Sequence, residues 1–141
     1  MTNPSAEPSD PNENRKHSGK RRALVVDDHE DSATGLAQAL ERLGYETEIA
    51  SDGVAALRKA NEMQPDIILL DIQMPKLDGY DACRVIRAQP WAENVRLLAV
   101  TGQEKTTVRY QSAEAGFDGY LLKPVEFDAL KKIAAWEAGL E

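Results

Sequence analysis

Short apolar runs alternate with amphipathic stretches along most of the chain. The runs lie near residues 23–26, 45–49, 66–71, 96–100 and 120–122. Each is too short for a helix, and residues 67–70 are apolar at every position, which is typical of a central parallel strand covered by helices on both faces. Between the runs, apolar residues recur every third or fourth position, which predicts helices. This alternation predicts right-handed βαβ units, and therefore an α/β fold with a doubly wound parallel sheet of five strands and five helices.

Capping residues indicate where the predicted helices begin and end. Asp31 or Ser32 is a candidate N-cap for the first helix, and Gly44 follows its last apolar position. The pair Asp78-Gly79 opens a later helix in the same way. The helix predicted over 104–115 has the weakest apolar stripe of the five, so we expect its packing to be the easiest to shift.

Composition indicates one folded domain. The chain has 141 residues, of which 42% are hydrophobic, which suits a single core. We expect residues 1–20 to be a disordered polar tail and residues 21–138 to form the domain. No apolar stretch approaches the ~18 residues of a membrane span, and the polar N-terminus is not a secretory signal. Cys83 is the sole cysteine, which fits a reducing cytoplasm, and we expect it to be a small buried residue of a helix.

The charge distribution argues against nucleic acid as a partner. The net charge is −7, although the residues just before the first strand are mostly basic, so the remainder of the chain is more acidic than the whole. An acidic body repels the phosphate backbone of DNA and RNA. We therefore expect no nucleic-acid partner, and without a span-length apolar stretch we expect no membrane partner.

Chemically complementary side chains follow four of the five predicted strands. Asp27 and Asp28 follow the first, Asp71 the third, Thr101 the fourth and Lys123 the fifth. Parallel strands share one carboxyl edge, so these groups should converge on one crevice. Three carboxylates that close repel one another unless a cation intervenes, and a ligand set made only of oxygen suits Mg2+. The ammonium and the hydroxyl could then hold a phosphoryl group.

The stretch from about Ala23 to Ala135 resembles the receiver domain of two-component response regulators. The residues that carry the resemblance are Asp27-Asp28, Asp71, Met74-Pro75, Asp78-Gly79, Thr101-Gly102 and the run 116–124 ending in Lys123-Pro124. It implies a flavodoxin-like sheet with strand order 2-1-3-4-5. It also implies a phosphorelay signalling protein rather than an enzyme, which takes a phosphoryl group from a histidine kinase or a histidine phosphotransfer protein and signals to a downstream protein.

The resemblance also assigns roles to residues. Asp71 is the implied phosphoacceptor, and Mg2+ would be held by Asp28 and Asp71 directly, by Asp27 through water and by the backbone carbonyl of Gln73. Phosphoryl oxygens would be bound by Thr101 and Lys123, with Gly102 leaving room for the backbone to approach, and a cis bond is implied before Pro124. Thr101 and Tyr120 would together change the surface of the helix over 104–115, the fifth strand and the last helix. Self-phosphorylation from small donors and autodephosphorylation are expected, and the latter should not be unusually fast because Gln73 and Gln103 are poor general bases.

Three other interpretations remain open. Haloacid-dehalogenase-type phosphatases also use a strand-ending aspartate with Mg2+, but they need a second aspartate two residues later, where this chain has Gln73. A phosphorylation-independent interaction module would not need the full acidic and basic set. Since only one further helix follows Lys123, we expect a free-standing regulator, and the alternative is a receiver fragment of a hybrid histidine kinase.

Overall fold

The computed structural model describes residues 19–76, 78–102 and 106–139. Most of the predicted tail, residues 1–18, lies outside the described residues, as does Gln103.

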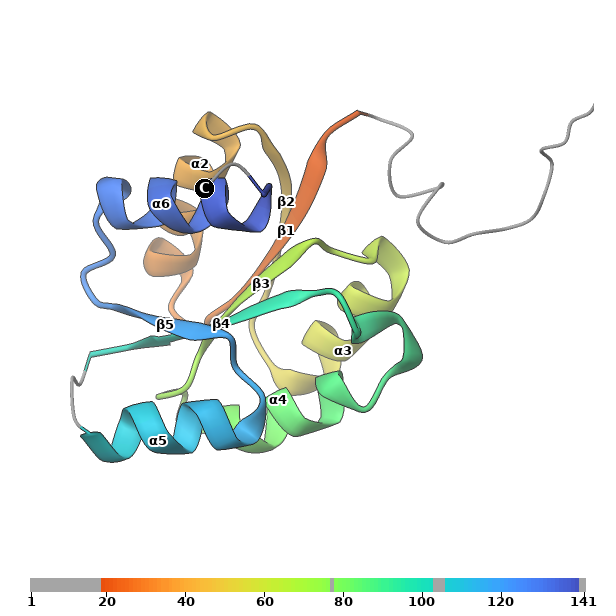
Figure 1. Ribbon diagram of the computed structural model, residues 1–141, viewed down its shortest axis with the longest axis vertical. Helices are drawn as coiled ribbons and strands as arrows, with labels where there is room; N and C mark the ends of the chain where they lie inside the picture. Colours follow the sequence, from red (N-terminus) through yellow and green to blue (C-terminus); the bar gives the residue numbers. More distant parts are fainter. Residues whose placement is uncertain (1–18, 77, 103–105, 140–141) are drawn as a thin grey trace, which may run out of the picture.

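The fold is built on a five-stranded sheet. All four strand pairs are parallel and the order is β2-β1-β3-β4-β5, which confirms the doubly wound, flavodoxin-like prediction (Figure 1). The strands are β1 (Arg21–Val26), β2 (Tyr45–Ala50), β3 (Ile67–Asp71), β4 (Arg96–Thr101) and β5 (Gly119–Leu122). The central strand β3 is buried along its whole length, as its uninterrupted apolar run predicted.

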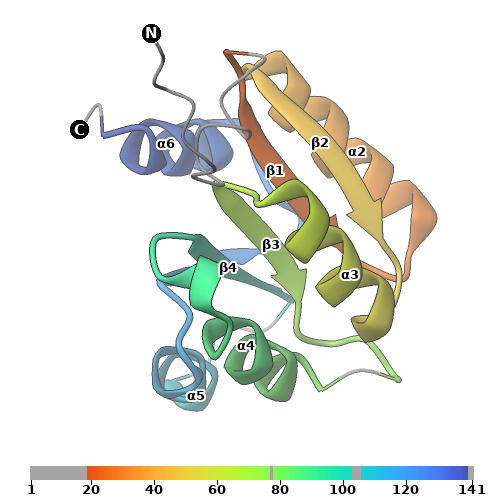
Figure 2. The ribbon, with the colours of Figure 1, turned by 90° about the vertical axis from the view of Figure 1, so that its right-hand side faces the viewer.

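Helices cover both faces of the sheet. Helices α2 and α6 lie on one face, and α3, α4 and α5 lie on the other (Figures 1 and 2). Their bounds are α2 (Glu30–Arg42), α3 (Gly53–Met63), α4 (Gly79–Arg87), α5 (Thr106–Ala115) and α6 (Phe127–Glu137), with a short 3₁₀ turn at Pro90–Ala92. Within the described ranges, no helix is long and apolar enough to cross a membrane.

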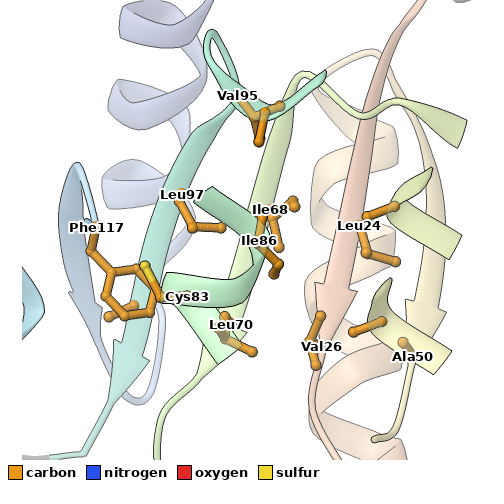
Figure 3. Close-up of a cluster of buried hydrophobic side chains, with 14 of the residues drawn as sticks. Leu24, Val26, Ala50, Ile68, Leu70, Cys83, Ile86, Val95, Leu97 and Phe117 are labelled. Atoms are coloured by element: carbon orange, nitrogen blue, oxygen red, sulfur yellow. The ribbon is translucent and has the colours of Figure 1, made fainter. Parts of the chain in front are cut away.

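Alternate side chains of β3 point into two separate cores. Ile68 and Leu70 pack with Cys83 and Ile86 of α4 on one face (Figure 3), whereas Ile67 and Leu69 pack beneath α2 and α6 on the other. Burying each such side chain contributes roughly 1.5–3 kcal/mol. The two cores hold β3 rigidly in the middle of the sheet, and so fix the position of Asp71 at its end.

Cys83 is buried in α4, as predicted. Its Sγ donates to the carbonyl oxygen of Ala115 at 3.3 Å, and burial raises the pKa of the thiol to about 11. The thiol therefore ties α4 to the end of α5 and stays protonated at neutral pH.

The first helix begins earlier than predicted. The N-cap is His29 rather than Asp31 or Ser32, and its side chain makes no capping hydrogen bond. The backbone N–H of His29 instead donates to Asp27 Oδ1 at 2.9 Å, which turns the chain directly from β1 into the helix. Glu30 and Asp31 then occupy the first turn, where negative charge is favourable.

Candidate functional site

The carboxyl edge of the sheet brings the three predicted aspartates together. Asp71 ends β3, and Asp27 follows Val26, the residue of β1 that lies beside Leu70. One carboxylate oxygen from each of Asp27, Asp28 and Asp71 lies within 4.8 Å of the others. The sequence prediction of a convergent acidic cluster is therefore matched by the geometry.

Asp71 is almost fully enclosed by its neighbours. Only 4% of the residue is exposed. Lys123 Nζ donates to Oδ2 at 2.7 Å, and the backbone N–H of Gln73 donates to Oδ1 at 2.8 Å. These donors hold the carboxylate in one orientation at the end of the central strand.

Asp27 carries an unmatched buried oxygen. Its Oδ1 accepts the hydrogen bond from His29, but its Oδ2 is buried without a protein partner among the described residues. Burial raises the pKa of Asp27, and the nearby Asp71 carboxylate raises it further, against the opposing effects of His29 and Lys123. A buried carboxylate oxygen without a protein partner leaves a position where a water or an ion can bind.

The residues present fit a hard divalent cation. Two of the three clustered aspartates are buried, whereas Asp28 is exposed. An oxygen donor set with an unsatisfied buried oxygen suits Mg2+, which accepts carboxylates and keeps several waters. The backbone carbonyl of Gln73, in the loop that follows Asp71, could supply a further oxygen ligand.

Thr101 and Lys123 lie on the neighbouring strand ends. Thr101 is fully buried at the end of β4, and its carbonyl accepts a hydrogen bond from the backbone N–H of Lys123 at 2.8 Å. The bond between Lys123 and Pro124 is cis, which confirms that prediction. The Lys123 ammonium therefore borders the same crevice as the carboxylates through its hydrogen bond to Asp71, and Thr101 ends the adjacent strand β4.

The loop after β3 is packed tightly against the start of α4. A Cβ on Gly79 would lie 2.6 Å from the Cα of Ile72, so only glycine fits there. Asp78 caps the helix by accepting from the N–H of Tyr80 at 2.9 Å. Asp78 and Gly79 thus anchor the start of α4 against Ile72, the residue before Gln73.

Two further side-chain contacts near the site were not indicated by the sequence. Gln73 Oε1 accepts a hydrogen bond from the backbone N–H of Gly102 at 2.6 Å. On the α5 side, Arg109 Nε donates to the hydroxyl of Tyr120 at 2.7 Å, with its guanidinium carbon 5.4 Å from the ring centroid. Both contacts join segments distant along the chain, so no local pattern could have indicated them.

A groove opens beside the carboxylates on the α2 face of the sheet. Its volume is about 550 Å³, and it runs between α2 and the segment that joins β5 to α6. Its lining includes Asp27 and Lys123 at one side and the apolar side chains Leu36, Val125 and Phe127. Arg42 stacks on the Phe127 ring at 4.5 Å from the centroid. The groove is thus continuous with the acidic crevice.

Sequence comparison relates the chain to response regulators. The response regulator receiver domain family matches residues 23–135. The alkaline phosphatase synthesis transcriptional regulatory protein PhoP of Bacillus subtilis is 40% identical over 104 residues, which cover 74% of this chain and 42% of PhoP. The response regulator MprA of Mycobacterium sp. strain KMS is 37% identical over 109 residues, covering 77% of this chain and 46% of MprA. The chain thus spans less than half the length of these curated relatives.

Solved structures agree with this relationship. The chemotaxis response regulator CheY4 of Vibrio cholerae has a TM-score of 0.78 at 28% identity, covering 84% of this chain and 98% of that one. The receiver domain of the sensor histidine kinase PA1611 of Pseudomonas aeruginosa, which has a magnesium ion in its active site cleft, has a TM-score of 0.77 at 34% identity, covering 85% and 98%. The sheet order, the clustered carboxylates and these similarities together show that the chain belongs to the response regulator receiver domain family of two-component signalling proteins.

Proposed function

We propose that this protein accepts a phosphoryl group on Asp71 and uses it to switch a binding surface. The observation that carries the proposal is the environment of Asp71, a buried carboxylate at the central strand end held by Lys123 and clustered with Asp27 and Asp28. The Lys123 ammonium, together with a cation held by the aspartates, would offset the charge on a transferring phosphoryl group.

The proposed reaction is transfer from a phosphohistidine. An Asp71 carboxylate oxygen bonds to phosphorus while the phosphorus–nitrogen bond of the donor breaks. The electron pair of that bond stays on the imidazole nitrogen, which takes a proton from solvent, and Asp71 becomes an acyl phosphate. Lys123 transfers its hydrogen bond from the carboxylate to a phosphoryl oxygen, and the Thr101 hydroxyl donates to another. Small donors such as acetyl phosphate would react in the same way, and hydrolysis would return the free carboxylate.

Mg2+ is the proposed cofactor. Asp28, Asp71 and the Gln73 carbonyl would hold it directly, with Asp27 through water. When bound, it offsets the negative charge shared by the carboxylates and the phosphoryl group. The buried, unpartnered Oδ2 of Asp27 supports this assignment.

The groove beside the crevice supports a histidine kinase or a histidine phosphotransfer protein as the donor. Its apolar lining, with Leu36 and Phe127, suits a helical partner, and Asp31 and Arg42 provide charges of both signs. A helix in this groove would bring its histidine to the side where Asp27 and Lys123 lie. A cytoplasmic location is part of the proposal, because Cys83 is a free thiol.

The proposed output surface consists of α5, β5 and α6. Thr101 would follow the phosphoryl group and Tyr120 would turn inward into the space it leaves. The half-buried Tyr120 ring lies against α5, where Arg109 holds its hydroxyl. A downstream protein that binds this surface better in one state would read the phosphorylation.

Labelling with acetyl phosphate tests the acceptor. Wild-type protein with Mg2+ should gain the mass of one phosphoryl group, and omission of Mg2+ should prevent the gain. Asp71→Asn should not be labelled under either condition. Undiminished labelling of that variant would show that the acceptor is another residue, and no labelling of the wild type would favour a constitutive interaction module.

Hydrogen exchange tests the switch. With Mg2+ and beryllofluoride, amide protection should change over 106–125 as well as around Asp71. Changes confined to the loops that touch Asp71 would show that α5 and β5 take no part in the output.

A further inference from the structure

The backbone N–H of Gly102 lies just past the end of β4, at the carboxyl edge of the sheet, and is already hydrogen bonded. Gly102 directly follows Thr101, and its N–H donates to Gln73 Oε1 at 2.6 Å. Gln73 also donates its own backbone N–H to Asp71 Oδ1 at 2.8 Å. Gln73 therefore links the Asp71 carboxylate, through its backbone, to the residue after β4, through its side chain.

From this geometry we infer that the Gln73 side chain is a removable gate, which occupies the Gly102 amide before phosphorylation and must leave for the phosphoryl oxygen to bind. The inference rests on the proposed function and adds a residue that tunes how readily the site takes its phosphoryl group. It concerns the side-chain amide, whereas the proposed metal ligand is the backbone carbonyl of the same residue.

The Gln73 amide oxygen and a phosphoryl oxygen would compete for the same donor, the Gly102 N–H. A backbone N–H has a single proton to give, so Gly102 cannot fully serve both the amide oxygen and a phosphoryl oxygen. The contact must be made by Oε1 rather than Nε2, because only the oxygen can accept. A phosphoryl oxygen carries negative charge and makes the stronger hydrogen bond, so it displaces the neutral amide. The cost of that displacement lowers the affinity of the site.

The Gln73 side chain and Gly102 are in close contact. A Cβ placed on Gly102 would lie 3.3 Å from Gln73 Oε1, which is closer than most real contacts. A side chain at position 102 would therefore press on the Gln73 amide. Gln73 is an exposed residue, so its side chain has room to turn into solvent.

The first test uses the metal-free protein. The exchange rate of the Gly102 amide with water, measured by NMR without phosphate or Mg2+, should rise in Gln73→Ala and in Gln73→Leu, because both lack the acceptor. Gln89→Ala is the matched control, since Gln89 lies between α4 and the 3₁₀ turn and its side chain donates to the carbonyl oxygen of Val85. An unchanged Gly102 rate in both Gln73 variants would overturn the inference.

The second test measures the affinity for beryllofluoride in the presence of Mg2+. Gln73→Ala and Gln73→Leu should both bind about two- to tenfold more tightly than wild type, which is the value of one neutral hydrogen bond. Gln73→Glu should bind more weakly, because its carboxylate holds the amide and repels the anion. If only Gln73→Ala binds beryllofluoride more tightly, the size of the side chain and not its hydrogen bond is responsible, which would contradict the proposed gate.

The two proposals fail in different ways. If the wild type binds no beryllofluoride and Asp71→Asn is still labelled by acetyl phosphate, the proposed function is wrong. If the wild type binds beryllofluoride at Asp71 but the Gln73 variants match it in affinity, only the gate is wrong.

Discussion

The contact between Arg109 and Tyr120 should set the balance of the output switch. Arg109 donates to the Tyr120 hydroxyl at 2.7 Å and lies over its ring. Both interactions exist only while the ring stays beside α5, so inward rotation must break them. Replacing Arg109 with alanine should therefore favour the inward, phosphoryl-bound state.

The size of this effect follows from the two contacts. A hydrogen bond of this type contributes about 1 kcal/mol, and an exposed cation–π contact contributes about 0.5–1 kcal/mol. Together they bias the ring by about 1.5–2 kcal/mol, which is about ten- to thirtyfold in population. If the outward ring dominates, the affinity for beryllofluoride in Arg109→Ala should rise by the same factor, because binding no longer has to break the contact.

Fluorine NMR of protein labelled with fluorotyrosine measures the ring directly. The four tyrosines give separable signals, and Tyr120→Phe identifies the relevant one. The Tyr120 signal of Arg109→Ala should move towards its position in wild type with beryllofluoride. Arg58→Ala, which removes an exposed arginine of α3 paired only weakly with Glu62, should leave the signal in place. A Tyr120 signal and a beryllofluoride affinity that are both unchanged in Arg109→Ala would refute the reasoning.

Three further predictions concern metal binding, pH and packing. Asp28→Ala should weaken Mg2+ binding more than Asp27→Ala, because direct coordination contributes more than a contact through water, and equal affinities in fluorescence titrations would contradict these roles. Burial and the hydrogen bond to Glu137 raise the pKa of Tyr45, so above about pH 10 the unfolded state loses this proton first and the free energy of unfolding should fall as pH rises. Urea titrations should show a smaller fall in Tyr45→Phe, and an identical fall would show that Tyr45 is not responsible. Gly79→Ala should lower the free energy of unfolding by about 1–3 kcal/mol, whereas Gly35→Ala, whose Cβ meets nothing within 4 Å, should not.

The central strand and its aspartate could be predicted because their signals are local. Residues 67–70 are apolar on both faces, which only a strand covered on both sides requires, and Asp71 follows at once. The parallel arrangement then places every strand-ending residue at one edge, so the convergence of Asp27, Asp71 and Lys123 follows from topology alone.

The side-chain contacts across the fold could not be predicted in this way. From the sequence, Glu137 is expected to be a solvated residue near the end of a helix, yet it is buried. Its carboxylate accepts hydrogen bonds from Arg21 Nε at 2.9 Å and from the Tyr45 hydroxyl. Its partners are distant in the chain and meet it only after β1, β2 and α6 have packed. The start of α2 was mispredicted for a related reason, because the side chain of Asp27 turns the chain before Asp31 or Ser32 is reached.

Locating the phosphoryl group on the chain shows whether Asp71 is the acceptor. After reaction with acetyl phosphate and Mg2+, borohydride reduces an acyl phosphate to the alcohol, which marks the acceptor permanently for peptide sequencing by mass spectrometry. The reduced residue should be found at position 71 and nowhere else, and none should form when Mg2+ is withheld. Reduction at position 27, 28 or 78 while residue 71 remains an aspartate would contradict this assignment.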